Sequence, residues 1–149
     1  MSASRSGETA GLTGLFDSSA SGAAKALLTE RNLNKGERLD CVSEGEAALG
    51  VVLSGRLEIS RPTEFPERRV VMGLLGPGAM VGETRFFGGE GCSDIITALE
   101  PTRVALLGES AWTKLMAESP SDHAVLVKAA LRTMALRLCK AYGRMSEVF

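Results

Sequence analysis

The chain has 149 residues, of which 44% are hydrophobic and 23% are charged. This length suits one globular domain with a buried core, and a formal net charge of −1 excludes a general electrostatic attraction to nucleic acids or acidic membranes. The N-terminal residues contain no apolar signal-peptide segment, and no apolar run approaches the ~20 residues that a membrane helix needs.

The three cysteines, Cys41, Cys92 and Cys139, are widely spaced and form no CxxC pair. An odd number of isolated cysteines is typical of a reducing compartment rather than of a disulfide framework. We therefore expect a cytoplasmic protein with no membrane partner.

Residues 1–11 are small and polar, and we expect them to be a disordered tail. From residue 12 the apolar positions recur at helical spacing, and a polar stretch over residues 17–22 divides them. This pattern predicts two short N-terminal helices, the second capped near Ser21.

Short apolar runs follow, separated by turns that draw on the chain's 17 glycines. The expected strands cover residues 32–39 (around a turn at Lys35-Gly36), 48–53, 56–60, 69–75, 95–99 and 103–107. The run 69–75 is apolar and β-branched enough to predict a buried strand. Short strands at such regular spacing are typical of a β-sandwich or a jelly roll.

The C-terminal part has a helical pattern. Ser110 is expected to cap a short helix that ends at Ser119-Pro120, and a long helix is expected over residues 121–149. Apolar residues of the long helix are separated alternately by three and four positions: Ala124, Val127, Leu131, Met134, Leu138, Ala141, Met145 and Val148. That alternation predicts a coiled-coil seam and a homodimer, and the alternative is a stripe that packs on the β body.

The same helix carries basic residues at Lys128, Arg132, Arg137, Lys140 and Arg144. A solvated basic face is the simplest interpretation, because cations are favoured near the C-terminal end of a helix. Contact with nucleic acid or with an acidic partner is the alternative.

The stretch from Val81 to Asp94 is the candidate ligand site. A Gly76-Pro77-Gly78 turn leads into Val81-Gly82-Glu83, and a glycine-rich segment follows over residues 88–91. Backbone N–H groups at such a turn bind anions, and a carboxylate beside them can accept a sugar hydroxyl. The pattern predicts a pocket for a phosphorylated nucleoside.

Five short motifs, in their order and spacing, resemble the cyclic-nucleotide-binding domain family: Lys35-Gly36-Glu37, Glu44-Gly45, Gly50-Val51-Val52-Leu53-Ser54-Gly55, Leu74-Leu75-Gly76-Pro77-Gly78 and Val81-Gly82-Glu83. The resemblance covers roughly residues 12–149. It implies a mainly β fold: an eight-stranded jelly-roll β-barrel flanked by short N-terminal helices and a long C-terminal helix. The tail 1–11 would then precede one domain over residues 12–149, with its dimerisation helix at 121–149.

The phosphate-binding cassette of that family aligns without gaps with Val81–Phe86 and Cys92-Ser93-Asp94. The resemblance implies that Glu83 binds the ribose 2′-hydroxyl and that Gly82, with the backbone amides of Glu83 and Thr84, holds the phosphate. It also implies that Ser93 supplies a hydroxyl to the phosphate.

The family's phosphate-binding arginine is replaced here by Cys92, and Asp94 adds a negative charge beside it. Arg85 is the candidate replacement cation. Loss of one member of a buried charge pair costs about 2–5 kcal/mol. We therefore expect weak, altered or lost binding of a cyclic nucleotide such as cyclic AMP or cyclic GMP.

The sequence contains no pattern of a catalytic triad, of paired carboxylates or of a multi-histidine metal site, so we expect neither an enzyme nor a cofactor. The resemblance implies a regulatory module in which a bound ligand repositions the last helix and changes the surface offered to a protein effector. Because no helix-turn-helix follows this helix in the sequence, direct DNA binding is not expected. The alternative hypothesis is a structural dimerisation or scaffold protein with an empty pocket.

Overall fold

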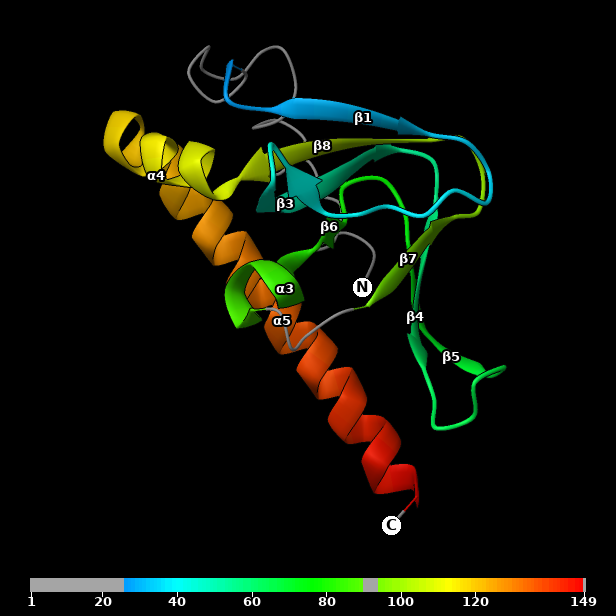
Figure 1. Cartoon of the computed structure of the whole chain (residues 1–149). Coiled ribbons are helices and arrows are strands. Elements are labelled where there is room, and N and C mark those ends of the chain that lie inside the picture. The colour runs from blue at the N-terminus through cyan, green and yellow to red at the C-terminus, as the bar shows by residue number, and fades with distance from the viewer. Residues whose placement is uncertain (1–25, 90–93, 149) are drawn as a thin grey trace.

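The computed structural model describes residues 26–89 and 94–148, and its β body precedes two C-terminal helices (Figure 1). The expected tail, most of the expected N-terminal helices and two candidate site residues, Cys92 and Ser93, lie outside the described residues.

The strands of the described residues form two antiparallel sheets. The larger sheet has the order β1-β8-β3-β2, and β6 also pairs with β3. Its strands are β1 (Thr29–Leu33), β2 (Val42–Ser43), β3 (Glu46–Ser54), β6 (Met80–Val81) and β8 (Thr102–Gly108). The smaller sheet has the order β5-β4-β7, and its strands are β4 (Leu57–Pro62), β5 (Arg69–Leu75) and β7 (Ile95–Ala98).

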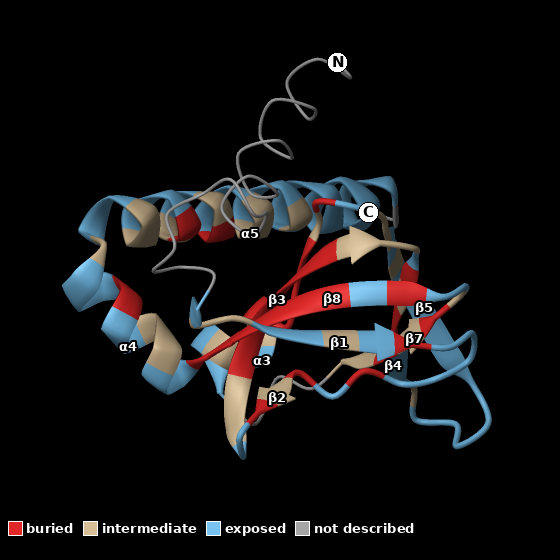
Figure 2. Cartoon of the chain, turned by 90° about the horizontal axis from the view of Figure 1, so that it is seen from above, coloured by how far each residue is buried: buried red, intermediate tan, exposed pale blue. Residues whose placement is uncertain are grey.

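The central strands β3 and β8 are buried on both faces (Figure 2). Side chains alternate along a strand, so each strand supplies residues to two layers of core. One layer joins the two sheets and contains Val52, Val104 and Leu106 together with Leu57 and Ile96. The other layer contains Leu49, Val51 and Leu107 together with Leu115, Leu126 and Ala130 of the C-terminal helices. Burial on both faces explains why these two strands are continuous apolar runs.

Three helices lie among the described residues: α3 (Glu83–Gly88), α4 (Glu109–Glu118) and α5 (Pro120–Val148). The predicted break between the last two is confirmed at Ser119, and α5 continues unbroken for 29 residues. Pro120 occupies the first position of α5, where a missing N–H costs no hydrogen bond. No helix among the described residues is long and apolar enough to cross a membrane.

The helix α5 contacts the β body mainly through residues outside the expected seam. Leu126 and Ala130 are buried against the sheet, and Met134, a residue of the expected seam, packs beside them. By contrast, Leu131 and Leu138 are 63% and 51% exposed. Every residue from 138 to 147 is exposed, so the β body covers only the first part of α5.

The mainly β fold with a long C-terminal helix is confirmed. The expected cap at Ser110 is wrong, because α4 begins at Glu109 and its N-cap residue is Gly108. Two strands also differ from expectation. The run 69–75 was expected to be buried, but Val70, Val71 and Leu74 are 50%, 52% and 54% exposed. Among the described strands β5 pairs with β4 alone, so it lies at the edge of its sheet. Residues 32–39 do not form one strand, because β1 ends at Leu33 and the chain turns at Gly36, whose φ is 88°. The closed eight-stranded barrel stays a prediction.

Candidate ligand-binding site

The turn between β6 and α3 positions the candidate site. Gly82 occupies this turn with a φ of 81°, a conformation that side chains other than glycine rarely adopt. A Cβ atom here would lie 2.8 Å from the carbonyl oxygen of Ala48 and 2.8 Å from the side chain of Cys41. The glycine therefore permits a close approach of the turn to β3, and Glu83, the next residue, is directed into the interior.

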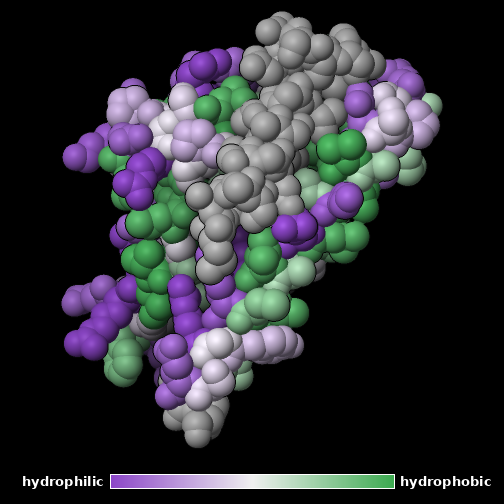
Figure 3. Space-filling model, turned by 180° about the vertical axis from the view of Figure 1, so that it is seen from behind, coloured by the Kyte–Doolittle hydropathy of each residue, from purple (hydrophilic) through white to green (hydrophobic). Residues whose placement is uncertain are grey.

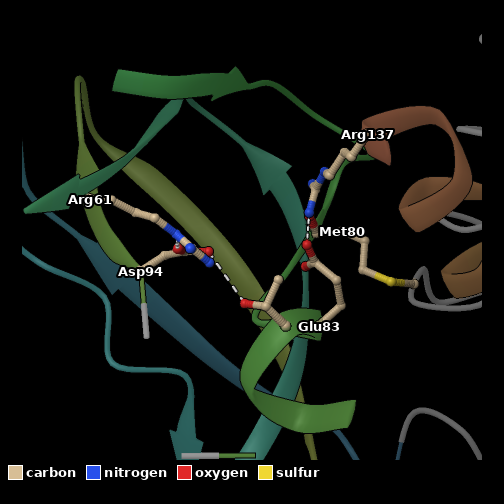
Figure 4. A network of polar contacts seen from close by, with 6 residues as sticks. Arg61, Met80, Glu83, Asp94 and Arg137 are labelled. Atoms are coloured by element: carbon tan, nitrogen blue, oxygen red, sulfur yellow. Dashed lines mark hydrogen bonds and ion pairs between the residues drawn. The ribbon is translucent and has the colours of Figure 1, made fainter. Parts of the chain in front are cut away.

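Glu83 is buried, with only 2% of its side chain exposed, and it forms an ion pair with Arg137 of α5 (Figure 4). The contact joins Oε1 of Glu83 to Nη1 of Arg137. The second guanidinium nitrogen, Nη2, donates a hydrogen bond of 2.8 Å to the carbonyl oxygen of Met80 on β6. One arginine thus joins α5 to both sides of the β6–α3 turn. Burial lowers the pKa of Arg137, but an arginine in a protein keeps its proton.

The second carboxylate oxygen of Glu83, Oε2, is buried and has no hydrogen-bond partner among the described residues. A buried charged oxygen without a partner is unusual in a folded protein and costs free energy. Because the atom is buried, a hydroxyl or N–H group of a ligand reaches it only after a shift of the side chains that cover it.

Asp94 lies at the other side of the site, just before β7, and its charge is compensated. Nε of Arg61 on β4 donates to Oδ1 of Asp94 at 2.5 Å. Oγ1 of Thr84 donates to Oδ2 of the same carboxylate at 3.3 Å. The negative charge that the sequence places beside the cassette is therefore held by an arginine that the sequence analysis did not single out.

Two cavities meet at these residues. A cavity of about 490 Å³ lies between the β4–β5 hairpin and α5, and a smaller one of about 140 Å³ lies beside α3. Ile59, Glu83, Thr84 and Asp94 line both of them. The larger volume falls within the ~300–1,000 Å³ that is usual for small-molecule sites.

Cys41 lines the smaller cavity beneath Gly82. Burial, reinforced by the nearby Asp40 carboxylate, raises the pKa of its thiol to about 12. The thiol of Cys41 therefore stays protonated at neutral pH, and the thiolate is the reactive form of a cysteine. Among the described residues no three His, Cys, Asp or Glu side chains group as a metal site.

The structure brings four of the six sequence-predicted site residues together. Gly82, Glu83, Thr84 and Arg85 line the smaller cavity, and Arg85 is exposed at its edge. The other two, Cys92 and Ser93, lie outside the described residues. That these six residues bind a ligand stays a prediction.

The contribution of α5 to the site differs from the sequence-based expectation. A solvated basic face was expected to include Arg137, and this is wrong, because Arg137 contacts a buried carboxylate. A signal was present: Arg137 follows Leu126 and Ala130 by 11 and seven positions, which places it on the helix face that meets the β body.

Comparisons with known proteins agree with this architecture. A family model of the cyclic nucleotide-binding domain matches residues 30–119, which is more than half of the chain. A comparison with curated proteins found no match.

Three similar solved structures illustrate the fold. A cyclic nucleotide-binding domain from Methylobacillus flagellatus KT has a TM-score of 0.68 at 21% identity, covering 83% of this chain and 69% of that one. The catabolite activator protein of Thermus thermophilus has a TM-score of 0.68 at 22% identity, and the match covers 90% of this chain and 62% of that one. The c-di-GMP responsive global regulator CLP of Xanthomonas campestris has a TM-score of 0.71 at 21% identity, and the match covers 83% of this chain and 60% of that one. At such identities the likeness shows the fold alone. This chain spans less than two thirds of the length of the catabolite activator protein and of CLP.

Replacing Arg137 by Met should destabilise the protein, because it leaves the Glu83 carboxylate buried and unpaired. Removing one partner of a buried pair costs about 3–5 kcal/mol, and we expect about 2–4 kcal/mol since the Arg137 side chain is 33% exposed. Urea unfolding at neutral pH measures the loss. The double variant Glu83→Gln/Arg137→Met should be less destabilised than Arg137→Met alone, because no unpaired charge remains.

The matched control is Lys128→Met, which removes an exposed cation from the same helix. We expect it to change the free energy of unfolding by less than about 0.5 kcal/mol. An Arg137→Met variant as stable as this control would contradict the structural role of the ion pair.

Proposed function

Because the chain belongs to the cyclic nucleotide-binding domain family, we propose that it is a non-enzymatic regulatory module that senses a small ligand beside Glu83 and responds through α5. One observation carries the proposal. Glu83 lines both cavities, and its carboxylate uses one oxygen for Arg137 of α5, while the other oxygen has no hydrogen-bond partner in the described part of the chain.

The mechanism follows from this arrangement. A ligand hydroxyl that donates to Oε2 of Glu83 redistributes the charge that Arg137 contacts on Oε1. The ligand therefore changes how strongly the carboxylate attracts Arg137 of α5. When that attraction differs between two positions of α5, ligand binding shifts the populations of those positions. Since the residues from 138 to 147 are exposed, movement there alters the surface that α5 presents to an effector protein.

We infer that the response to cyclic nucleotides is weak, altered or lost, because Cys92 stands where the family's cassette has its phosphate-binding arginine. A different ligand is supported by one protein of this fold, the regulator CLP, which is c-di-GMP responsive. Cyclic AMP and cyclic GMP remain the reference ligands. In this proposal they bind through Glu83 without the usual neutralisation of the phosphate.

A homodimer through α5 is also proposed. Leu131, Leu138, Tyr142 and Met145 follow one another at intervals of seven, four and three, which places them on one helix face. All four are more than half exposed. Hydrophobic side chains are visible at the surface among hydrophilic ones (Figure 3). An apolar stripe of this spacing is the kind that two helices bury together.

Finer features of the family complete the proposal. The two sheets would be the halves of an eight-stranded jelly-roll barrel, and the protein would act in the cytoplasm. The expected absence of direct DNA binding stays a prediction.

A second candidate function is a dimeric scaffold with an empty pocket. It is favoured by the ion pair itself, because Arg137 of the same chain compensates the charge of the Glu83 carboxylate. Such a protein would keep its helix position fixed and act through protein contacts alone.

A Cys92→Arg variant should bind cyclic AMP more tightly than the wild type, because it restores a cation to the cassette. Calorimetric titration of both should show a gain of about thirtyfold or more in the variant. Cys139→Arg, the same exchange at an exposed position of α5, is the control and should show no gain. Equally tight binding by the wild type and Cys92→Arg would contradict the proposed loss of the phosphate clamp, and silence of every variant would favour the scaffold.

The double variant Leu131→Glu/Leu138→Glu should convert a dimer into a monomer, because it places charges in the apolar stripe. Sedimentation equilibrium measures the change. Leu136→Glu is the matched control, since Leu136 is 47% exposed on a different helix face and should leave the dimer intact. A wild-type protein that is monomeric at its highest soluble concentration would rule out the dimer.

A further inference from the structure

The larger cavity carries more positive than negative charge. Its lining includes four cationic side chains, Arg61, Arg137, Lys140 and Arg144, and two carboxylates, Glu83 and Asp94. Four positive minus two negative charges leaves an excess of two.

The excess positive charge lies on α5. Arg61 is paired with Asp94, and Arg137 is paired with Glu83. Lys140 and Arg144 line the same cavity and form no ion pair within the described part of the chain. Positions 137, 140 and 144 are three and four apart, so these side chains lie on one face of the helix. Two uncompensated cations therefore border the cavity one and two turns beyond Arg137.

The wall opposite these cations is apolar. Met72 and Leu74 of β5 line the cavity and are 43% and 54% exposed, with Ile59 and Leu75 further inside. Apolar side chains that line a cavity offer a surface on which the ring of a ligand can pack. Basic groups on one wall, apolar groups on the other and a buried acceptor between them match a molecule with phosphate, ring and hydroxyl groups.

We propose that this cavity takes a nucleotide with two negative charges, and that Lys140 and Arg144 of α5 bind its phosphate in place of a cassette arginine. The inference rests on the proposed function and names its ligand class. A cyclic mononucleotide brings one negative charge and leaves one cation uncompensated, whereas a dianionic nucleotide neutralises both. Because both cations belong to α5, such a ligand holds directly the segment that the β body leaves exposed.

The test is calorimetric titration of the full chain with cyclic di-GMP, which has two phosphodiesters, with GMP, which has one phosphomonoester, and with cyclic AMP. The wild type should bind a dianionic probe more tightly than cyclic AMP, and added salt should weaken the binding. Binding of cyclic di-GMP alone indicates two separated phosphates, and binding of GMP alone indicates a single doubly charged one. Either result supports the proposal.

The variant Lys140→Ala/Arg144→Ala should lower the affinity for the bound dianionic probe by about tenfold to hundredfold, since it removes two charge-assisted contacts. The control Lys114→Ala/Lys128→Ala removes the same charge from exposed positions outside the cavity and should leave the affinity unchanged. Circular dichroism checks that each variant is folded. The single variants Lys140→Gln and Arg144→Gln provide a second measurement with smaller disturbance of the helix.

The outcomes separate this inference from the proposed function. Tight binding of cyclic AMP with no binding of cyclic di-GMP or GMP would overturn the inference and leave the sensor intact. Equal affinity of the wild type and the Lys140→Ala/Arg144→Ala variant for a dianionic probe would also overturn it. Failure of all three nucleotides to bind the folded wild type would overturn the inference, and silence of the Cys92→Arg variant as well would favour the scaffold over the sensor.

Discussion

The ion pair between Glu83 and Arg137 joins the candidate ligand site to the long helix α5. Glu83 is buried because Gly82 brings its turn against β3, and the carboxylate must then find a positive partner in the interior. Arg137 supplies it from α5 and also binds the carbonyl oxygen of Met80. These two contacts fix the position of α5 relative to the β6–α3 turn of the candidate site.

Stability and position come from different interactions. Burial of a side chain such as Leu126 contributes about 1.5–3 kcal/mol, and it holds the first part of α5 on the β body. A buried ion pair contributes little net stability, because the desolvation of both charges offsets their attraction. What it adds is a defined position, since a misplaced helix leaves a charge buried and unpaired. Beyond Arg137, residues 138–147 are exposed, which leaves this segment the most readily displaced part of α5.

Much of the fold could be predicted from the sequence, because local patterns encode it. The continuous apolar runs of β3 and β8, the glycine turns and the break at Ser119-Pro120 each follow from the residues involved. The site could be predicted only in part. Gly82 and Glu83 are recognisable as a turn beside an acid, but their partner is 54 positions away, and no local pattern pairs a glutamate with one arginine among five basic residues of α5. The exposure of β5 was missed for a similar reason, because an apolar run does not reveal whether another layer covers it.

Solution NMR of the arginine side chains tests the central claim most directly. If Arg137 is bound to Glu83 and to Met80, its guanidinium protons should exchange slowly with solvent and its guanidinium rotation should be restricted, while those of Arg144 should exchange rapidly. The Glu83→Gln variant should release Arg137 to behave like Arg144. A guanidinium of Arg137 that rotates and exchanges as freely as that of Arg144 in the wild type would contradict the account.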